Sequence, residues 1–366
     1  MNRFRRAATQ SKKHPNYNKT HHRIEEIFNI LDKWVTKTYE GKHVSYGLIY
    51  DPDCENNIGV VGAEDFIEFL NDEFSAVLSD SITSAFILNK ECDLVSYETV
   101  FDSKDSNGIV AGTQLINNLP LRFADIISKT VVNNRVGVFL LTNGDLILCK
   151  KQKIRFVKRE NKWLNFNIKA FKNALNQFII ENSISNELIE EIYSSALDVS
   201  FSHAGGIISL DLDIDRIVDS QIERNRIVNR CDYICDDSDE EIKLYLQNKN
   251  NDLPLDARIE ERILQKDIKK KLLKRNIIKK LVNGKNFLSL NRKLKSELIA
   301  LDGACIIDKN GNICSFGAII QNDSGSSGGG RGAAAKKLST NGFAIKISTD
   351  GYIELFYKQN KIFVIK

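Results

Sequence analysis

Apolar residues recur along the chain with two different periods, which predict helices and strands in alternation. Spacing of three and four residues is typical of helices and predicts them over 21–39, 63–78, 119–130, 168–180, 186–197 and 291–300. Short apolar runs between turn residues predict strands over 44–50, 85–88, 135–141, 146–150, 153–157, 163–167, 207–212, 305–308, 313–320, 342–348, 352–357 and 362–365. A further helix is expected from Ala333. The fold class that follows is α/β (α+β).

The order of these elements predicts two domains. Asn143-Gly144, between two apolar runs, indicates a β-hairpin and places a meander in an α+β domain over residues 21–167. A helical connector over 168–185 leads to a mixed β-sheet flanked by helices over 186–366, with an insertion at about 214–285. Residues 1–20 are polar and basic and are expected to form a disordered tail, with Thr20 capping the first helix.

Composition places the chain among soluble globular proteins. Of its 366 residues, 42% are hydrophobic and 27% charged. No apolar run reaches the ~18 residues of a membrane span, and no signal-peptide core follows the basic start, so we expect a cytoplasmic protein without a membrane partner. The seven scattered cysteines fit free thiols in a reducing compartment. Cys231 and Cys235 lack the spacing of a zinc site.

Positive charge is concentrated in one segment of the insertion. Residues Lys266–Lys285 hold nine lysines or arginines and one acid, on a pattern of apolar residues that predicts an amphipathic helix. A solvated basic face explains this pattern, and binding of nucleic acid or another polyanion is the alternative. Because no stacking aromatic residues accompany the segment, the solvated face is favoured. The acidic cluster at 236–241 is read in the same way, as a surface helix start.

Asp302 and Gly303 lie between a predicted helix and a predicted strand. A carboxylate at the mouth of a strand is suited to hold Mg²⁺ or Mn²⁺, with nucleotide phosphate oxygens completing the coordination shell. A tight Asp-Gly turn is the structural alternative.

A glycine-rich run follows about two dozen residues later. Gly328, Gly329, Gly330 and Gly332 leave the backbone around Arg331 bare, and successive N–H groups in such a loop form an anion-binding concavity. A helix starting at Ala333 would point its N-terminus at the same anion. A flexible linker is the alternative, since glycine and serine tracts are often linkers. The two motifs bracket a predicted hairpin, which would bring them to one edge of the sheet.

The strings LDGACIIDKNGNICSFGAII, SSGGGRGAAAKKLS and GFAIKISTDGYIELFYKQNKIFVI resemble the diadenylate cyclase domain of the DNA-integrity-scanning type. That family has an Asp-Gly-Ala motif, a G-T-R-H-R-x-A loop and a late strand ending in Ser and polar residues. Gly205-Gly206 and the following apolar run resemble the family's first strand, which lines the nucleotide pocket. The resemblance covers roughly residues 186–366, apart from the insertion.

The resemblance implies a metal-dependent nucleotidyltransferase that acts as a face-to-face homodimer. Two ATP molecules, or two of another NTP, would condense into a cyclic dinucleotide, cyclic di-AMP for ATP, and pyrophosphate. Asp302, Gly303, Ala304 and Arg331 would be catalytic, with Asp302 as the ligand of Mg²⁺ or Mn²⁺. The implied nucleotide-binding residues are Gly205, Gly206, Gly328, Gly329, Gly330, Gly332, Ala333, Ser348 and Asp350.

The chain departs from the family in its glycine loop. Gly330-Arg331-Gly332 stands where the family has Arg-His-Arg, so two polar side chains are missing. Either backbone N–H groups and Lys336 or Lys337 replace them, or the domain binds a nucleotide or cyclic dinucleotide without cyclising it. The segment around Gly144 and Trp163 bears a weaker resemblance to sensor domains that precede divergent cyclases. It implies that the N-terminal domain is regulatory, and a purely structural or dimerising domain is the alternative.

Overall fold

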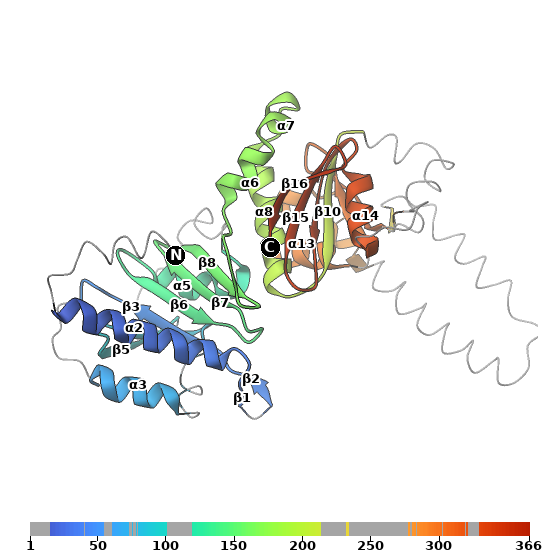
Figure 1. The fold of residues 1–366 in the computed structure, drawn as a ribbon. Coiled ribbons are helices and arrows are strands. Elements are labelled where there is room, and N and C mark those ends of the chain that lie inside the picture. Colours follow the sequence, from blue (N-terminus) through green and yellow to red (C-terminus); the bar gives the residue numbers. More distant parts are fainter. Residues whose placement is uncertain are drawn as a thin grey trace, which may run out of the picture. The chain divides into compact units, whose positions relative to one another are not determined.

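The computed structural model describes most of the chain and divides it into two compact units at residue 168, with Ile365 grouped with the first. The described residues are 15–39, 41–54, 61–72, 75, 78, 80–100, 119–213, 232–233, 277–278, 280–282, 284–301, 303–318, 320 and 329–366. Asp302, Gly328 and most of 266–285 therefore lie outside them, as do Cys231, Cys235 and the acidic cluster. Figure 1 shows the elements of each unit.

The first unit is built on a seven-stranded mixed sheet in the order β5-β4-β3-β6-β7-β8-β9. Only β3 and β4 run parallel, and the predicted meander is confirmed because β6 to β9 pair antiparallel in sequence. Gly144 has φ +82° in the turn between β6 and β7, as the hairpin prediction requires. A short ribbon, β1 (Thr38–Tyr39) with β2 (Lys42–His43), stands apart. The strands are β3 (Tyr46–Tyr50), β4 (Ser84–Leu88), β5 (Leu94–Thr99), β6 (Val136–Leu140), β7 (Leu146–Lys150), β8 (Lys153–Arg159) and β9 (Lys162–Leu164).

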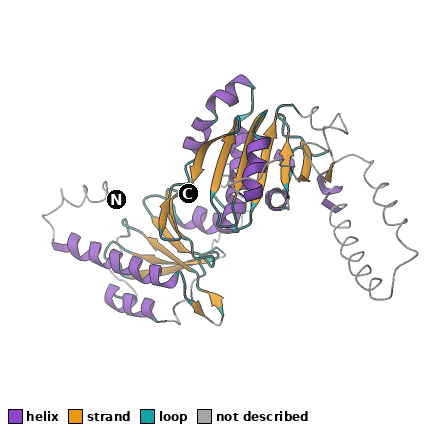
Figure 2. Cartoon of the chain, turned by 45° about the vertical axis from the view of Figure 1, so that its right-hand side comes forward, coloured by secondary structure: helices purple, strands orange, loops and turns teal. Residues whose placement is uncertain are grey.

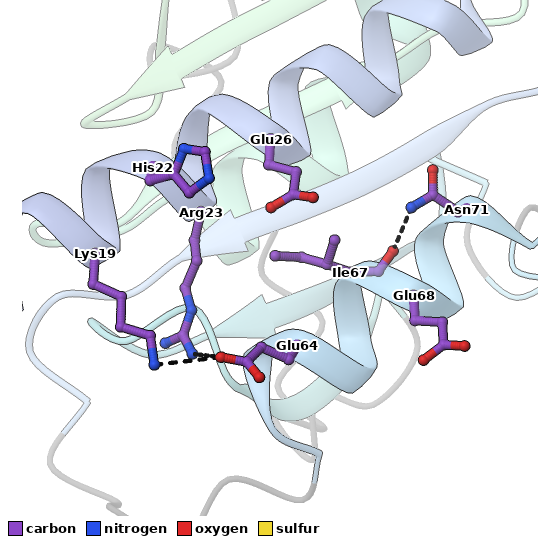
Figure 3. A pocket seen from close by; sticks show the side chains of 8 residues that line it. All are labelled: Lys19, His22, Arg23, Glu26, Glu64, Ile67, Glu68 and Asn71. Carbon is purple, nitrogen blue, oxygen red and sulfur yellow. Dashed lines mark hydrogen bonds and ion pairs between the residues drawn. The ribbon is translucent and has the colours of Figure 1, made fainter.

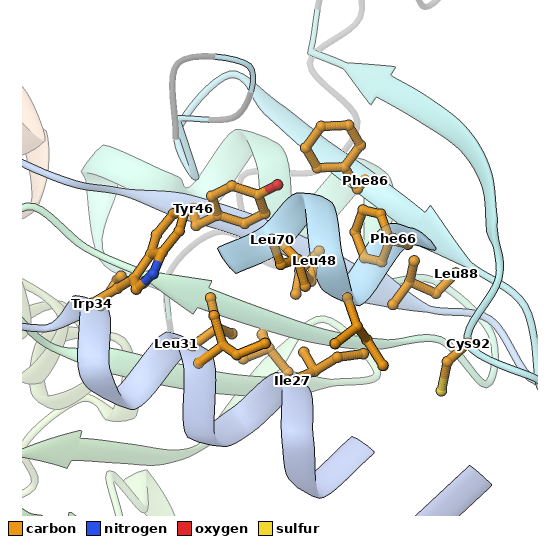
Figure 4. Close-up of a cluster of buried hydrophobic side chains, with 14 of the residues drawn as sticks. Ile27, Leu31, Trp34, Tyr46, Leu48, Phe66, Leu70, Phe86, Leu88 and Cys92 are labelled. Carbon is orange, nitrogen blue, oxygen red and sulfur yellow. The ribbon is translucent and has the colours of Figure 1, made fainter. Parts of the chain in front are cut away.

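Two helices, α2 (Pro15–Trp34) and α3 (Ala63–Asn71), cover one face of this sheet. Their apolar stripes meet Tyr46 and Phe86 in the core of the unit (Figure 4). The ring of Tyr46 lies edge-on to Trp34, with centroids 5.6 Å apart, and stacks on Phe86 at the same distance. Burial of these rings, with the aliphatic side chains around them, stabilises the unit.

Helix boundaries in the first unit differ from the sequence expectation. Helix α2 begins at Pro15, which suits a first helical turn, so Thr20 lies inside the helix and does not cap it. Helix α3 stops at Asn71, where the N–H of Asp72 bonds to the carbonyl of Phe69. The helix expected over 119–130 is a 3₁₀ turn, η2 (Leu121–Phe123), followed by α5 (Ala124–Thr130).

The second unit contains another seven-stranded mixed sheet, in the order β11-β13-β12-β10-β14-β15-β16. Strands β10 and β12 run parallel, whereas β10 pairs antiparallel with β14, β13 with both β11 and β12, and β14 with β15. Helix α14 (Gly329–Leu338) packs on one face, where Ala335 meets Ile207 and Ala344. Its strands are β10 (Gly206–Asp211), β11 (Asp232–Tyr233), β12 (Ala304–Ile307), β13 (Ile313–Ala318), β14 (Gly342–Ile347), β15 (Ile353–Tyr357) and β16 (Asn360–Ile365).

Helices α8 (Asn186–Phe201) and α13 (Arg292–Ala300) cover the opposite face, since Gly206 alternates with Ile207 and lies against Ile299 of α13. Figure 2 shows helices on both sides of these strands. Both helices begin at capping side chains, Ser185 for α8 and Asn291 for α13. Mixed sheets flanked by helices in both units agree with the predicted α/β (α+β) class. A short 3₁₀ turn, η3 (Phe287–Ser289), precedes α13.

Residues 168–185, expected as one connecting helix, form α6 (Ile168–Ala174) and α7 (Asn176–Glu181). Their aromatic residues pack onto the second unit: Phe171 lies 5.0 Å from Tyr193 between ring centroids, and Phe178 lies 5.5 Å from Phe343. The segment therefore belongs to the core of the second unit.

The five cysteines among the described residues are free thiols. Cys92, Cys149 and Cys305 are buried, whereas Cys54 and Cys314 are partly exposed. Burial raises the pKa of Cys305 to about 12, so this thiol stays protonated at neutral pH. No helix among the described residues combines the length and apolarity needed to cross a lipid bilayer.

Candidate functional site

Three strands of the second sheet bring the sequence-predicted residues to one end of it. Because β10 and β12 are parallel, with Ile207 opposite Ala304, both strands start at that end. The antiparallel β14 finishes there, with Ile347 opposite Gly206. Ala304 also pairs with Ala318, so the two ends of the β12–β13 hairpin meet there as expected. Gly205, Gly303 and Ser348 therefore lie at the ends of neighbouring strands, a set of positions called the strand-end rim below.

Helix α14 starts four residues earlier than the sequence indicates. It begins at Gly329, not Ala333, so Gly329, Gly330 and Gly332 form its first turn with Arg331 and are not an open loop. The change matters little for anion binding, because the first N–H groups of a helix have no partner within the helix. They carry the positive end of the helix dipole, which favours anions.

Arg331 lies directly against Gly205. A Cβ atom on Gly205 would fall 2.3 Å from Nη1 of Arg331, so any other residue would displace the guanidinium. Arg331 is exposed, and it forms no hydrogen bond or ion pair within the described part of the chain. A cation in the first turn of a helix adds to the positive potential of the dipole. Arg331 therefore brings to the rim, beside β10, a positive charge that no ion pair within the described residues engages.

Other residues of the two motifs have packing roles. Gly303 has φ +116°, and a Cβ atom there would fall 2.3 Å from the carbonyl carbon of Gly317. Ala304 is buried beneath α14, where its methyl group packs in the apolar cluster. Gly206 lies against the carbonyl of Ile299. These residues set the backbone that positions the rim, and the catalytic roles implied for Gly303 and Ala304 stay predictions.

Ser348 and Asp350 lie in the turn that follows β14. The Ser348 hydroxyl accepts a hydrogen bond from the N–H of Tyr352 at 3.1 Å, and the N–H of Gly351 donates to the carbonyl of Ser348 at 2.9 Å. Ser200 of α8 donates a hydrogen bond to the carbonyl of Gly351. The turn is thus tied to α8, and it leaves Asp350 exposed at the rim.

Sequence reasoning missed an ion cluster beside the rim, formed by Lys346, Glu354 and Lys361. Glu354 accepts hydrogen bonds from Lys346 at 2.9 Å and from Lys361 at 2.5 Å. Burial acts to raise the pKa of Glu354, but the two lysines outweigh it and hold that pKa below its ordinary value. The sequence contains a signal of this cluster, because Lys346 interrupts the apolar strand 342–347. Its partner, Glu354, becomes evident only once the strand register is known.

Two ion pairs hold α13 against α8, immediately before Asp302. Arg292 forms a bidentate pair with Asp198 at 2.7 and 3.0 Å. Lys295, which is 3% exposed, pairs with Glu191 at 2.7 Å. Charged pairs at this depth fix the position of one helix on the other, because breaking either one would remove the opposite charge that offsets the cost of burial.

The metal site lies outside what the structure tests. Among the described residues, no group of three His, Cys, Asp or Glu side chains is arranged to hold a metal ion. Asp302, the predicted ligand, and Gly328 are outside the described residues. The role of Asp302 and the use of Mg²⁺ or Mn²⁺ stay predictions.

A separate cleft of about 380 Å³ lies in the first unit, between α2 and α3 (Figure 3). Charged side chains line it, and at one end Lys19 and Arg23 both contact Glu64, at 3.3 and 3.2 Å. Because Lys19 and Arg23 are already paired with the Glu64 carboxylate, the cleft attracts an anion less strongly than the rim does.

Comparison with known proteins gives matches of low overall similarity. A hypothetical membrane-spanning protein from Bacillus cereus is 14% identical, with a TM-score of 0.27, over 54% of this chain and 74% of its own. DacA from Staphylococcus aureus, a diadenylate cyclase, is 13% identical, with a TM-score of 0.26, over 48% of this chain and 86% of its own. No protein-family model and no curated protein matches the chain. Function is therefore inferred from the residues of the chain.

Proposed function

We propose that the second unit is a nucleotidyltransferase of the diadenylate cyclase type, condensing two ATP molecules into cyclic di-AMP and pyrophosphate. The observation that carries the proposal is the meeting of Gly205, Gly303 and Arg331 at one strand-end rim, from three distant parts of the sequence. The same segments carry the sequence resemblance. The first N–H groups of α14 also meet there, and a helix N-terminus is a common binding site for phosphate.

The proposed chemistry depends on positioning and charge neutralisation. The 3′-hydroxyl oxygen of one nucleotide attacks the α-phosphorus of the other, a new P–O bond forms, and the bond to pyrophosphate breaks. Asp302, immediately before the tightly packed Gly303, takes the hydroxyl proton. Arg331 and the N–H groups of the first turn of α14 hold phosphate oxygens. The attack occurs twice, and two protomers face each other because each site holds half of the product.

In this proposal, Asp302 is the one residue that would bind a divalent cation. Mg²⁺ or Mn²⁺ would neutralise charge on the phosphates when it is bound. The first unit is proposed to regulate the reaction.

Incubation with ATP and Mn²⁺, followed by mass spectrometry, tests the proposal. Cyclic di-AMP and pyrophosphate are the expected products, and Asp302→Ala is expected to abolish both. Asp308→Asn is a matched control at the other end of β12, where Asp308 only orders a turn by accepting N–H groups of Asn310 and Asn312. Absence of a nucleotide product with all four NTPs would contradict the proposal.

One observation favours a second function, binding without turnover. Within the first turn of α14, Arg331 is the only cationic side chain, where the resembling family has three polar ones. Loss of a transition-state donor costs on the order of 2–4 kcal/mol. A nucleotide or cyclic-dinucleotide sensor with the same fold would show thermal stabilisation by ATP and no product in the same assay.

A further inference from the structure

We propose that Lys346 is a phosphate-binding residue of the rim and supplies a second positive charge beside Arg331 of the glycine-rich first turn of α14. This inference rests on the proposed nucleotide site and names the group that recognises the polyphosphate part of the ligand. It assigns the role to Lys346 in place of Lys336 or Lys337, which lie in the last turn of α14.

Lys346 has an unusual place in the sheet. Directly opposed residues form a row across four strands, in which Ala304 pairs with Ile207, Ile207 with Lys346, and Lys346 with Glu354. Opposed residues point to the same face, here the apolar face beneath α14. The side chains of Lys346 and Glu354 are only 19% and 14% exposed.

Stability alone does not explain a charged pair at this place. A buried ion pair is often no more stabilising than apolar residues of similar volume, because both ions lose their hydration. Nearby positions on the same face carry Ala344 and Phe356, so an apolar pair would fit its surroundings. A role for the charge itself is the simpler explanation.

The side chain of Lys346 extends to the first turn of α14. The Lys346 ammonium lies 3.9 Å from the point where a Cβ atom of Gly332 would stand. Gly332 adjoins Arg331, whose guanidinium covers Gly205. The two cations therefore flank the first turn of α14, Arg331 towards β10 and Lys346 beneath the helix. The absence of a side chain at Gly332 leaves Lys346 open to that turn.

Glu354 has a second lysine partner. Lys361 contacts the other oxygen of that carboxylate, Oε1, while Lys346 contacts Oε2. If Lys346 turns to a phosphate, Glu354 keeps Lys361 as its partner and is not left uncompensated. The cluster carries two positive charges and one negative, so its net charge attracts an anion. Lys346 can thus exchange partners at low cost.

The test is the affinity of the full chain for ATP and for adenosine, measured by calorimetry on four variants. Lys346→Met should weaken ATP binding about tenfold to a hundredfold, the size expected for a lost charge-assisted hydrogen bond, and leave adenosine binding unchanged. Lys346→Arg should restore most of the ATP affinity. Lys361→Met, which removes the outer lysine of the same cluster, is the matched control and should change ATP affinity less than threefold.

A fourth variant distinguishes loss of ATP binding from misfolding. Lys346→Met with Glu354→Met replaces the pair by apolar side chains, which this face tolerates, and it should show the same selective loss of ATP affinity. Unchanged ATP affinity in this double variant, with wild type binding ATP, overturns the role of Lys346 and leaves the proposed function standing. Equal loss of ATP and adenosine also overturns it, since that result indicates a structural role. Failure of the wild type to bind any nucleotide overturns both proposals.

Discussion

At the residue scale, Gly303 of the Asp-Gly motif is packed against the backbone of Gly317. Replacing it with alanine would force a side chain at φ +116° into the backbone of Gly317, 2.3 Å away. We expect Gly303→Ala to lower the free energy of unfolding by roughly 3 kcal/mol or more, since strain and overpacking add. Urea denaturation measures this.

Gly284→Ala is the control for that substitution. Gly284 also has positive φ, +67°, but nothing lies within 4 Å of its Cβ position. The expected cost is about 1 kcal/mol, from backbone strain alone. Equal losses for both variants would show that the contact with Gly317 is unimportant.

Gly205 should behave in the opposite way. A methyl group there meets the far end of the flexible Arg331 side chain, which can move into solvent. We expect Gly205→Ala to leave the midpoint of urea unfolding nearly unchanged while weakening ATP binding about as much as Arg331→Met does. Calorimetric titration compares the two variants, and full ATP affinity in Gly205→Ala would exclude the contact from the site.

The Asp80 carboxylate predicts a pH effect in the first unit. Burial acts to raise its pKa, but hydrogen bonds from the backbone and hydroxyl of Thr83 and the N–H groups of Ile82 and Ser84 outweigh it and lower the pKa below 3.8. A lowered folded-state pKa gives stability that is present above the ordinary value and lost as pH falls through the folded one. Asp80→Asn should therefore lose less stability than wild type between pH 6 and about pH 3. Urea unfolding across this range decides it, and parallel curves would contradict the assignment.

At the element scale, one buried ion pair joins β8 to the turn before β7. Arg159 and Asp145 are 2% and 1% exposed and form a bidentate pair at 2.9 and 2.6 Å. Asp145→Ala should cost about 3–5 kcal/mol of unfolding free energy, because the arginine stays buried after losing the carboxylate that offsets its charge. Glu297→Ala breaks the exposed pair with Lys293 and should cost less than about 1 kcal/mol. Similar costs for both would show that burial does not decide the effect.

Helices and strands were predictable to different degrees. The β6–β7 hairpin followed from Asn143-Gly144, since two positive-φ-tolerant residues between apolar runs specify a tight turn. The start of α14 could not be predicted in this way, because Gly329 and Gly330 have low helix propensity. They lie in the helix because Ala334 and Ala335 pack on the sheet. The ends of α3 and the break between α6 and α7 likewise depend on tertiary contacts.

The candidate site was predictable only in part. The meeting of the Asp-Gly segment and the glycine run followed from the hairpin between them, and the pairing of Ala304 with Ala318 agrees. The contact of Arg331 with Gly205 and the Lys346–Glu354 pair depend on strand order and register, which apolar periodicity does not specify.

At the scale of the whole molecule, the proposed reaction requires two copies of the chain. Each rim would hold one ATP, so turnover per protein molecule should rise with protein concentration until the dimer is fully formed. Light scattering at the same concentrations should show the dimer at the point where the rate levels off. A rate per molecule that does not vary while the protein is monomeric would contradict the face-to-face arrangement.

The central claim is that the strand-end rim of the second sheet binds a nucleotide. Photo-crosslinking with 8-azido-ATP, followed by mass spectrometry of the peptides, tests it most directly. We expect the label on peptides that carry Gly205, Arg331 or Ser348, with competition by ATP and loss of the label in Arg331→Met. Label confined to other peptides, or not displaced by ATP, would contradict the account.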